Sequence, residues 1–317
     1  MNDATSPDIT VALEWMAEHP LSSRLFFNEN GKRDVQGINA GKSAAWRAAC
    51  VPEKNGKPPS LVINIDSEDG PGATLCSLIH EARHAAQIEA GAKDPHGHPP
   101  GSLLLLAILE ADAVAVEAVV AVRLGRAGRR EPIEEASQEP DHAHLEAAWL
   151  ATKPDALDVT DERLYEIAME TAFSDPVRNL LLAFGHSDRE YARAGFDEAR
   201  NACDVIETLP LSRPLPQNAL AASPFRLDEN ARVVALAAGL ARTAAKKTTG
   251  TERIAFLAKA RALADSPPSP KKYAMAADVA LAASAALDED AVVPAISWLA
   301  KECLAAAASL SKSGIER

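Results

Sequence analysis

The sequence has little positive charge, and this excludes one large class of partner. Among its 317 residues, 45 are Asp or Glu and only 33 are Lys or Arg, so the formal net charge is −12 at pH 7. A surface of that sign repels a phosphate backbone. The longest basic cluster, at residues 126–130, is short, and Glu131 follows it at once. We therefore expect no nucleic-acid partner.

Cysteine is also scarce, and its four copies are scattered. Cys50, Cys76, Cys203 and Cys303 form no C-x-x-C motif and no closely spaced framework of the kind that disulfide-rich domains carry. This pattern is typical of a reducing compartment, where thiols stay free. The first eight residues are acidic and lack the apolar segment of a secretory signal. The sequence thus predicts a cytoplasmic protein, or one exported by a route that needs no signal peptide.

The most apolar segment, residues 103–122, is not an uninterrupted hydrophobic run. Glu110, Asp112 and Glu117 lie within it. A charged side chain at the centre of a bilayer costs roughly a few kcal/mol. Burial in a protein core, with at least one of these acids paired or bound to a metal, is the simpler interpretation. We expect no membrane span.

The order of apolar residues predicts a mainly α-helical protein with a small β element. Apolar and polar side chains alternate over residues 61–66, which predicts a strand, and one or two further short strands are expected between residues 21 and 59. Proline interrupts the chain in two later segments, 209–224 and 266–270. Helices are predicted at 8–18, 73–90, 102–126, 141–152, 159–173, 176–206, 229–247, 251–265, 271–287 and 290–311.

The most informative stretch runs from His80 to His84 and spells H-E-x-x-H. Because it falls within a predicted helix, the two histidines lie one turn apart on the same face. Their imidazoles can therefore bind one metal ion, the arrangement that holds zinc in many hydrolases. Glu81, one step round the helix, can reach a water on that metal and take its proton. Glu81 is thus the predicted general base.

A hydrolytic zinc site takes three protein ligands and keeps one position for water, so the motif needs a third ligand. The metzincin-type solution places a histidine at position 90, where this chain has Ala90. Glu110, in the next predicted helix, fits better, because a lone carboxylate would be costly to bury in its apolar surroundings. Two alternatives stay open. Glu110 could instead pair with an arginine such as Arg83, and Glu117, on the same helix face, is the rival ligand.

Other polar residues near the motif have two interpretations each. Asp112 lies on the other side of its helix from Glu110, and it either supports a ligating histidine or is exposed. Gln87, close to one turn after His84, either lines a cleft or bonds a backbone group. Cys76 is expected to be a small buried thiol. The sequence does not choose among the candidates for oxyanion stabilisation, which are Tyr165, Tyr191, His186 and Arg189.

Two motifs together carry a resemblance to a known family. H-E-x-x-H at residues 80–84, followed by E-x-x-A from Glu110 to Ala113, resembles the motif pair of gluzincin metallopeptidases. The sequence H-E-A-R-H-A-A-Q at residues 80–87, followed by E-A-D-A at residues 110–113, is similar to the sequences of a bacterial family that is assigned to the metallopeptidases by sequence alone. The resemblance covers about residues 20–125.

The resemblance implies a fold and a set of roles. It implies a zincin-like domain in which His80, His84 and Glu110 bind Zn²⁺ and Glu81 serves as general base and proton shuttle. It also implies that the strand at residues 61–66 lies near the cleft and that an extended peptide can pair with such an edge. The resemblance does not extend to the C-terminal half, so it carries no substrate class.

We expect four segments: a zincin-like metal-binding domain at 1–130, a helical extension at 131–208 that completes or covers the cleft, a proline-rich linker at 209–228 and a helical bundle at 229–317. The expected function is that of a zinc-dependent metalloprotease acting on a peptide or protein substrate. The alternative is a catalytically silent protein of the same fold that holds a protein partner through its C-terminal helices. Glu81 favours the enzyme, because a structural zinc needs no base. A helical scaffold without metal is a third, weaker alternative.

Overall fold

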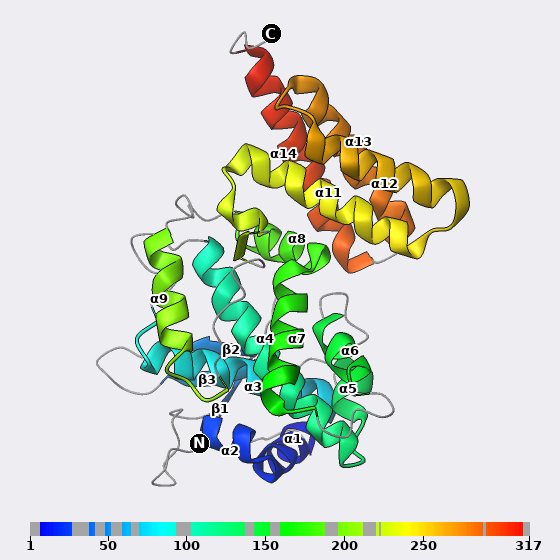
Figure 1. Ribbon diagram of the computed structural model, residues 1–317. Coiled ribbons are helices and arrows are strands. Elements are labelled where there is room, and N and C mark those ends of the chain that lie inside the picture. Colours follow the sequence, from blue (N-terminus) through cyan, green and yellow to red (C-terminus); the bar gives the residue numbers. More distant parts are fainter. Residues whose placement is uncertain are drawn as a thin grey trace. The chain divides into compact units, whose positions relative to one another are not determined.

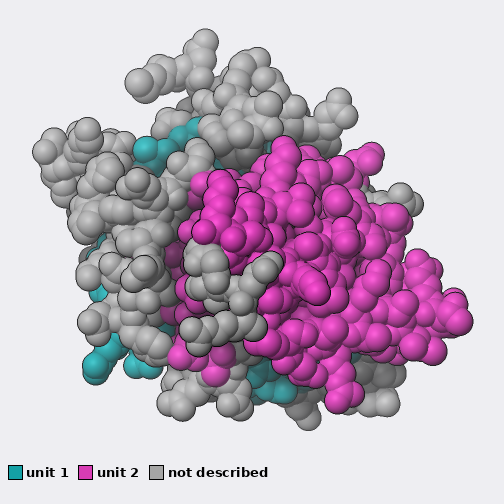
Figure 2. Space-filling model, turned by 90° about the horizontal axis from the view of Figure 1, so that it is seen from above, with its two compact units in different colours: residues 1–101, 108–172, 196–216 teal, residues 102–107, 173–195, 217–317 magenta. Residues whose placement is uncertain are grey.

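In the residues that it describes, the computed structural model is mainly helical with a small sheet, which confirms the predicted fold class at that level (Figure 1). The chain divides into two compact units, distinguished by colour in Figure 2. Unit 1 comprises residues 1–101, 108–172 and 196–216, and unit 2 comprises residues 102–107, 173–195 and 217–317. The structure describes residues 7–26, 38–41, 48–51, 59–64, 70–92, 103–136, 143–152, 159–187, 196–211, 220–221, 223–287 and 290–312.

The sheet of unit 1 has three strands in the order β1-β3-β2. The central strand β3 (Ser60–Asn64) pairs in parallel with β1 (Ile38–Gly41) and antiparallel with β2 (Ala48–Val51). The strand predicted from residue 61 is thus present as β3, and β1 and β2 are the further short strands. Our expectation that this strand offers its edge to a peptide was wrong, because both of its edges are already paired. In the described sheet, β2 is an edge strand.

Helix α3 is the unit 1 helix whose contacts with this sheet are established among the described residues. Helix α3 carries the H-E-x-x-H motif and packs against β2, β3, α1 and α5. Nearly every side chain of α4 from residue 108 to 125 is buried, the exceptions being Glu110 and Arg123. The helices that lie wholly or largely in unit 1 are α1 (Pro7–Glu18), α2 (Pro20–Phe26), α3 (Pro71–Glu89), α4 (Leu103–Arg126), α5 (Glu131–Ala136), α6 (Ala143–Leu150), α7 (Asp161–Ser174) and α9 (Phe196–Ile206).

Neighbouring residues explain where α3 begins and where it ends. Pro71 occupies the first turn, where its missing N–H costs nothing, and the side chain of Glu135 accepts hydrogen bonds from the backbone N–H groups of Gly72 and Ala73 at 2.8 and 3.1 Å. This carboxylate also offsets the positive end of the helix dipole. At the other end, Gly91 adopts a φ of 93°, the left-handed conformation that commonly ends a helix.

Unit 2 is helical in its described residues. Helices α11, α12 and α13 pack together, and α14 packs against α13 and α11. Alanine dominates their buried faces, and Gly239 brings α11 so close to α8 that a Cβ there would lie 2.9 Å from the Pro176 side chain. The elements are α8 (Pro176–Gly185), η1 (Pro224–Arg226), α11 (Glu229–Lys247), α12 (Gly250–Asp265), α13 (Pro270–Leu287), η2 (Asp290–Val292) and α14 (Val293–Lys312).

One predicted helix was wrong. Residues 176–206 do not form a single helix, because α8 ends at Gly185 and α9 begins at Phe196. Glycine is a poor interior residue for a helix, and the backbone turns at His186 and Ser187 directly after it.

Among the described residues, one helical stretch, Asp290–Lys312, is long and apolar enough to cross a bilayer by length and composition alone. The core helix of a soluble protein meets the same criterion, so this stretch is weak evidence for a membrane span. The apolar segment 103–122, for which we expected no membrane span, is largely buried in the protein.

Candidate metal centre

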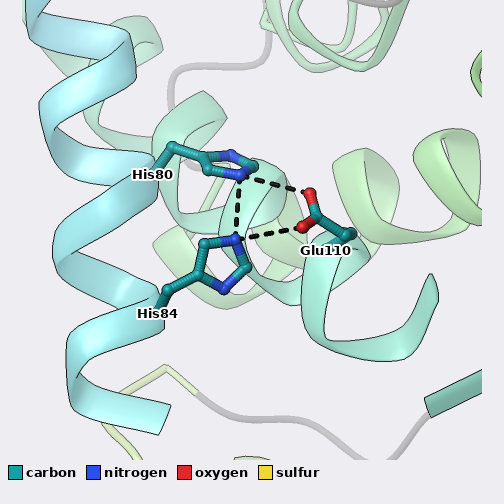
Figure 3. A group of neighbouring side chains, drawn as sticks. All are labelled: His80, His84 and Glu110. Atoms are coloured by element: carbon teal, nitrogen blue, oxygen red, sulfur yellow. Dashed lines mark hydrogen bonds and ion pairs between the residues drawn. The ribbon is translucent and has the colours of Figure 1, made fainter. Parts of the chain in front are cut away.

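Three side chains from two helices converge on one point in unit 1 (Figure 3). His80 and His84 project from the same face of α3, and the carboxylate of Glu110 on α4 faces both rings. The Nε2 atom of His80 lies 3.2 Å from Oε2 of Glu110, and Nε2 of His84 lies 3.3 Å from its Oε1. The two Nε2 atoms are 3.0 Å apart. Glu110, and not its rival Glu117, completes this group of metal-ligating residue types.

These distances suit a tetrahedral ion. Zinc bonds of about 2.0–2.1 Å place neighbouring ligand atoms roughly 3.3 Å apart. The donor set of two imidazoles and one carboxylate is that of hydrolytic zinc sites, which keep a fourth position for water or substrate. The side chains of His80, His84 and Glu110 retain 17%, 16% and 21% of their exposure, so the group is open to solvent. The residues therefore fit a divalent metal.

The electrostatics of the group favour added positive charge. Burial by itself lowers the pKa of His80, but Glu110 and Glu117 beside it raise that pKa to about 10. Burial also opposes charge on His84, and Glu110 again raises its pKa. In return, burial raises the pKa of Glu110 but the two histidines hold it well below its ordinary value. Glu110 is thus held in its ionised form beside the two imidazoles.

Glu81 lies beside this group and contacts the sheet. Its Oε2 accepts a hydrogen bond of 2.6 Å from the backbone N–H of Cys50 on β2. Its negative charge also contributes to the raised pKa of both His80 and His84. The general base predicted from the motif therefore lies between the histidine pair and the edge strand.

A second layer of polar side chains lies behind His84. The Nδ1 atom of His84 is 2.8 Å from Oε1 of Gln87, and the amide nitrogen of Gln87 donates to Oδ2 of Asp112 at 2.6 Å and to the carbonyl oxygen of Leu109 at 2.9 Å. Asp112 is fully buried, which rules out the interpretation that it is exposed. Gln87 does bond a backbone group, as one interpretation held, and it also reaches the ring of His84.

Arg83, which we considered as a partner of Glu110, forms an ion pair with Asp112 instead. Arg83 donates from Nε to Oδ2 of Asp112 at 2.7 Å and from Nη2 to Oδ1 at 2.8 Å, while its Nη1 donates to the Pro210 carbonyl oxygen at 3.1 Å. The hydroxyl of Tyr165 donates to Oδ1 at 2.6 Å. Burial raises the pKa of Asp112, but Arg83 and the other donors lower it below its ordinary value. Sequence reasoning missed this arrangement, since its members lie on distant segments.

Glu117 lies behind the other histidine. Its Oε2 is 3.6 Å from Nδ1 of His80, the ring nitrogen opposite the one that faces Glu110, and its Oε1 is 3.8 Å from Nε2 of His144 on α6. Nothing in the sequence spacing of His144 singled it out. Cys76 is a buried thiol near the carbonyl oxygen of Pro132, as expected.

The candidates for oxyanion stabilisation lie in different parts of the chain, and two of them fall outside the described residues. Tyr165 is fully buried, and its hydroxyl is already bonded to Asp112. His186 follows the last residue of α8 in unit 2. Tyr191 and Arg189 lie outside the described residues.

Comparison with known proteins supports a metallopeptidase. Residues 56–179 match the sequence model of a family described as "Putative metallopeptidase family (DUF6782)". No significant match was found among curated proteins or among solved structures. The matched segment contains α3, α4 and α7, and therefore every residue of the convergent group and of the polar layer behind His84 except Pro210. Over this segment the chain is similar to a metallopeptidase family, a likeness that specifies neither the gluzincin type nor the metal.

Proposed function

We propose that this protein is a zinc-dependent metallopeptidase of the gluzincin type, with His80, His84 and Glu110 as ligands. The observation that carries the proposal is the convergence of three donor atoms, from two helices, at the separations that a tetrahedral ion requires. The lowered pKa of Glu110 adds support, because a partly buried carboxylate beside two imidazoles favours a cation at that point. The family match over residues 56–179 is independent support for the reaction class.

The chain's own residues supply the proton transfers. His80, His84 and Glu110 would hold the zinc ion, which when bound would polarise the scissile carbonyl and lower the pKa of water. Glu81 takes the proton from the attacking water and then delivers it to the leaving amine, so one carboxylate acts as base and afterwards as acid. The contact of Glu81 with Cys50 brings it beside β2, and an edge strand presents backbone groups that an extended peptide can pair with. We therefore assign the substrate's backbone to β2.

The test combines metal analysis with peptide cleavage. We expect the purified protein to hold about one zinc ion per chain and to cleave members of a peptide library. Glu81→Gln should retain the metal and lose activity by about 10²–10⁴-fold, because the amide cannot accept the proton. His84→Ala is the matched variant that should lose both metal and activity.

Each other outcome has a defined meaning. Cleavage by Glu81→Gln at the wild-type rate removes Glu81 from the mechanism. A protein that binds zinc stoichiometrically and cleaves no peptide is instead the catalytically silent alternative. A protein that binds no zinc after titration with the ion contradicts the proposal as a whole.

A further inference from the structure

The side chains behind His84 form a hydrogen-bonded relay in which every donor and acceptor can be identified. Asp112 accepts four hydrogen bonds, two from Arg83, one from Tyr165 and one from Gln87. An ionised carboxylate has about four acceptor sites, so the capacity of Asp112 is used in full. Since Arg83 and Asp112 are both completely buried, solvent does not compete for these bonds.

This saturation decides the orientation of the Gln87 amide. The side of the amide that faces Asp112 and the Leu109 carbonyl oxygen meets two acceptors, so it must be the NH₂ group, which has two N–H donors. The carbonyl oxygen of Gln87 is then the atom that faces His84, 2.8 Å from Nδ1. The reversed amide would place its oxygen against a carboxylate oxygen and a carbonyl oxygen, two acceptors that offer it no hydrogen.

The amide orientation in turn decides which nitrogen of His84 carries hydrogen. A carbonyl oxygen only accepts, so Nδ1 of His84 must donate. In the neutral ring, the form that binds a metal, the lone pair is then left to Nε2, the atom that faces Glu110 and His80. The ring is held in that rotation at the same time.

We propose that Gln87 is a positioning residue that presets His84 for metal binding through the relay Arg83–Asp112–Gln87–His84. This inference rests on the proposed function, since it concerns the ligand role of His84. Without the relay, His84 would exchange between tautomers and ring orientations, and ordering it would reduce the affinity for the ion. The arginine inside the H-E-x-x-H motif therefore acts on the second histidine through two intermediates.

The first measurement is the zinc affinity of the full-length protein, obtained by competition with a chromophoric chelator. Gln87→Met has a similar length and lacks the amide, and we expect it to bind zinc about 10–100-fold more weakly. Tyr165→Phe is the matched control, because it removes a buried bond to the same carboxylate but to Oδ1, and leaves the Gln87 bond to Oδ2. It should lower the melting temperature of the metal-free protein and change zinc affinity by less than about threefold.

A second measurement needs no variant. In the zinc-loaded wild type, ring ¹⁵N spectra should show His84 bound through Nε2, with an Nδ1–H that exchanges slowly with solvent. Hydrogen on Nε2 and coordination through Nδ1 would overturn the inference, as would wild-type zinc affinity in Gln87→Met. Weakening of zinc binding by both variants in proportion to their loss of stability would show a merely structural role. Absence of zinc binding by the wild type would instead contradict the proposed function, and the inference with it.

Discussion

Arg83 and Asp112 form an ion pair in which neither side chain has any exposure to solvent. Transfer of two charges into the interior is costly, and it is repaid here by a two-point contact and by the additional donors from Gln87 and Tyr165. Such a pair stabilises the fold less than an equal volume of apolar side chains could. In the proposed relay, this pair fixes the carboxylate that orients Gln87.

Breaking this pair should be expensive because it leaves an uncompensated buried charge. We expect Asp112→Asn to lower the free energy of unfolding of the metal-free protein by about 3–5 kcal/mol, measured by urea denaturation. The control is Arg163→Gln, which removes the exposed pair of Arg163 and Glu166 on α7 and should cost at most about 1 kcal/mol. Equal losses for the two variants would mean that Asp112 is not the buried partner of Arg83.

At the scale of elements, α3 approaches α5 closely at a glycine in its first turn. Gly72 lies in the first turn of α3, and a Cβ there would lie 2.5 Å from the backbone carbonyl of Glu131. Backbone cannot move aside as a flexible side chain can. The N-terminal end of α3 can therefore lie this close to α5 only because residue 72 has no side chain.

We expect Gly72→Ala to lower the free energy of unfolding by about 1–3 kcal/mol through overpacking, and to weaken zinc binding because α3 must shift. Gly185→Ala is the matched control. It makes the same substitution at the last residue of α8, where an added Cβ would meet nothing within 4 Å and the φ angle is not positive. This variant should be neutral or slightly more stable. A stable Gly72→Ala protein with unchanged zinc affinity would contradict the proposed contact.

The sequence predicted these elements unevenly. Long helices with continuous apolar faces, such as α4 and α11, were recognised with ends within a residue or two. The helix at 176–206 was wrong, because α8 ends at Gly185 and α9 begins only at Phe196. The partners of β3 were expected only as unspecified short strands, since the four residues of β2 carry almost no periodic signal.

For the whole molecule, the formal net charge is −12 and the described residues are mostly helical. The predicted compartment, partners and segment limits stay predictions, including a protein partner for the C-terminal helices. The proposed metal has one consequence for the entire chain. An ion that binds only the folded state stabilises that state in proportion to the logarithm of its concentration.

We expect zinc at about 100 times its dissociation constant to stabilise unit 1 by about 2.7 kcal/mol. Calorimetry of the full chain, with zinc and with excess chelator, should therefore show a higher unfolding temperature in the metal-bound protein. His84→Ala should unfold at the same temperature under both conditions. A wild-type unfolding profile that chelator leaves unchanged would point to a helical scaffold that holds no metal.

The sequence by itself determined the local part of the candidate site. Two histidines four residues apart on a helix must share a face, and an acid within an apolar helix must find a compensating charge. Only the tertiary structure decided which acid met the histidines, which met Arg83 and which lay behind His80. The bond between Tyr165 and Asp112 joins α7 to α4, and the bond between Arg83 and Pro210 spans 127 positions. Such pairings depend on how helices pack, and helical periodicity carries no information about the partner across the interface.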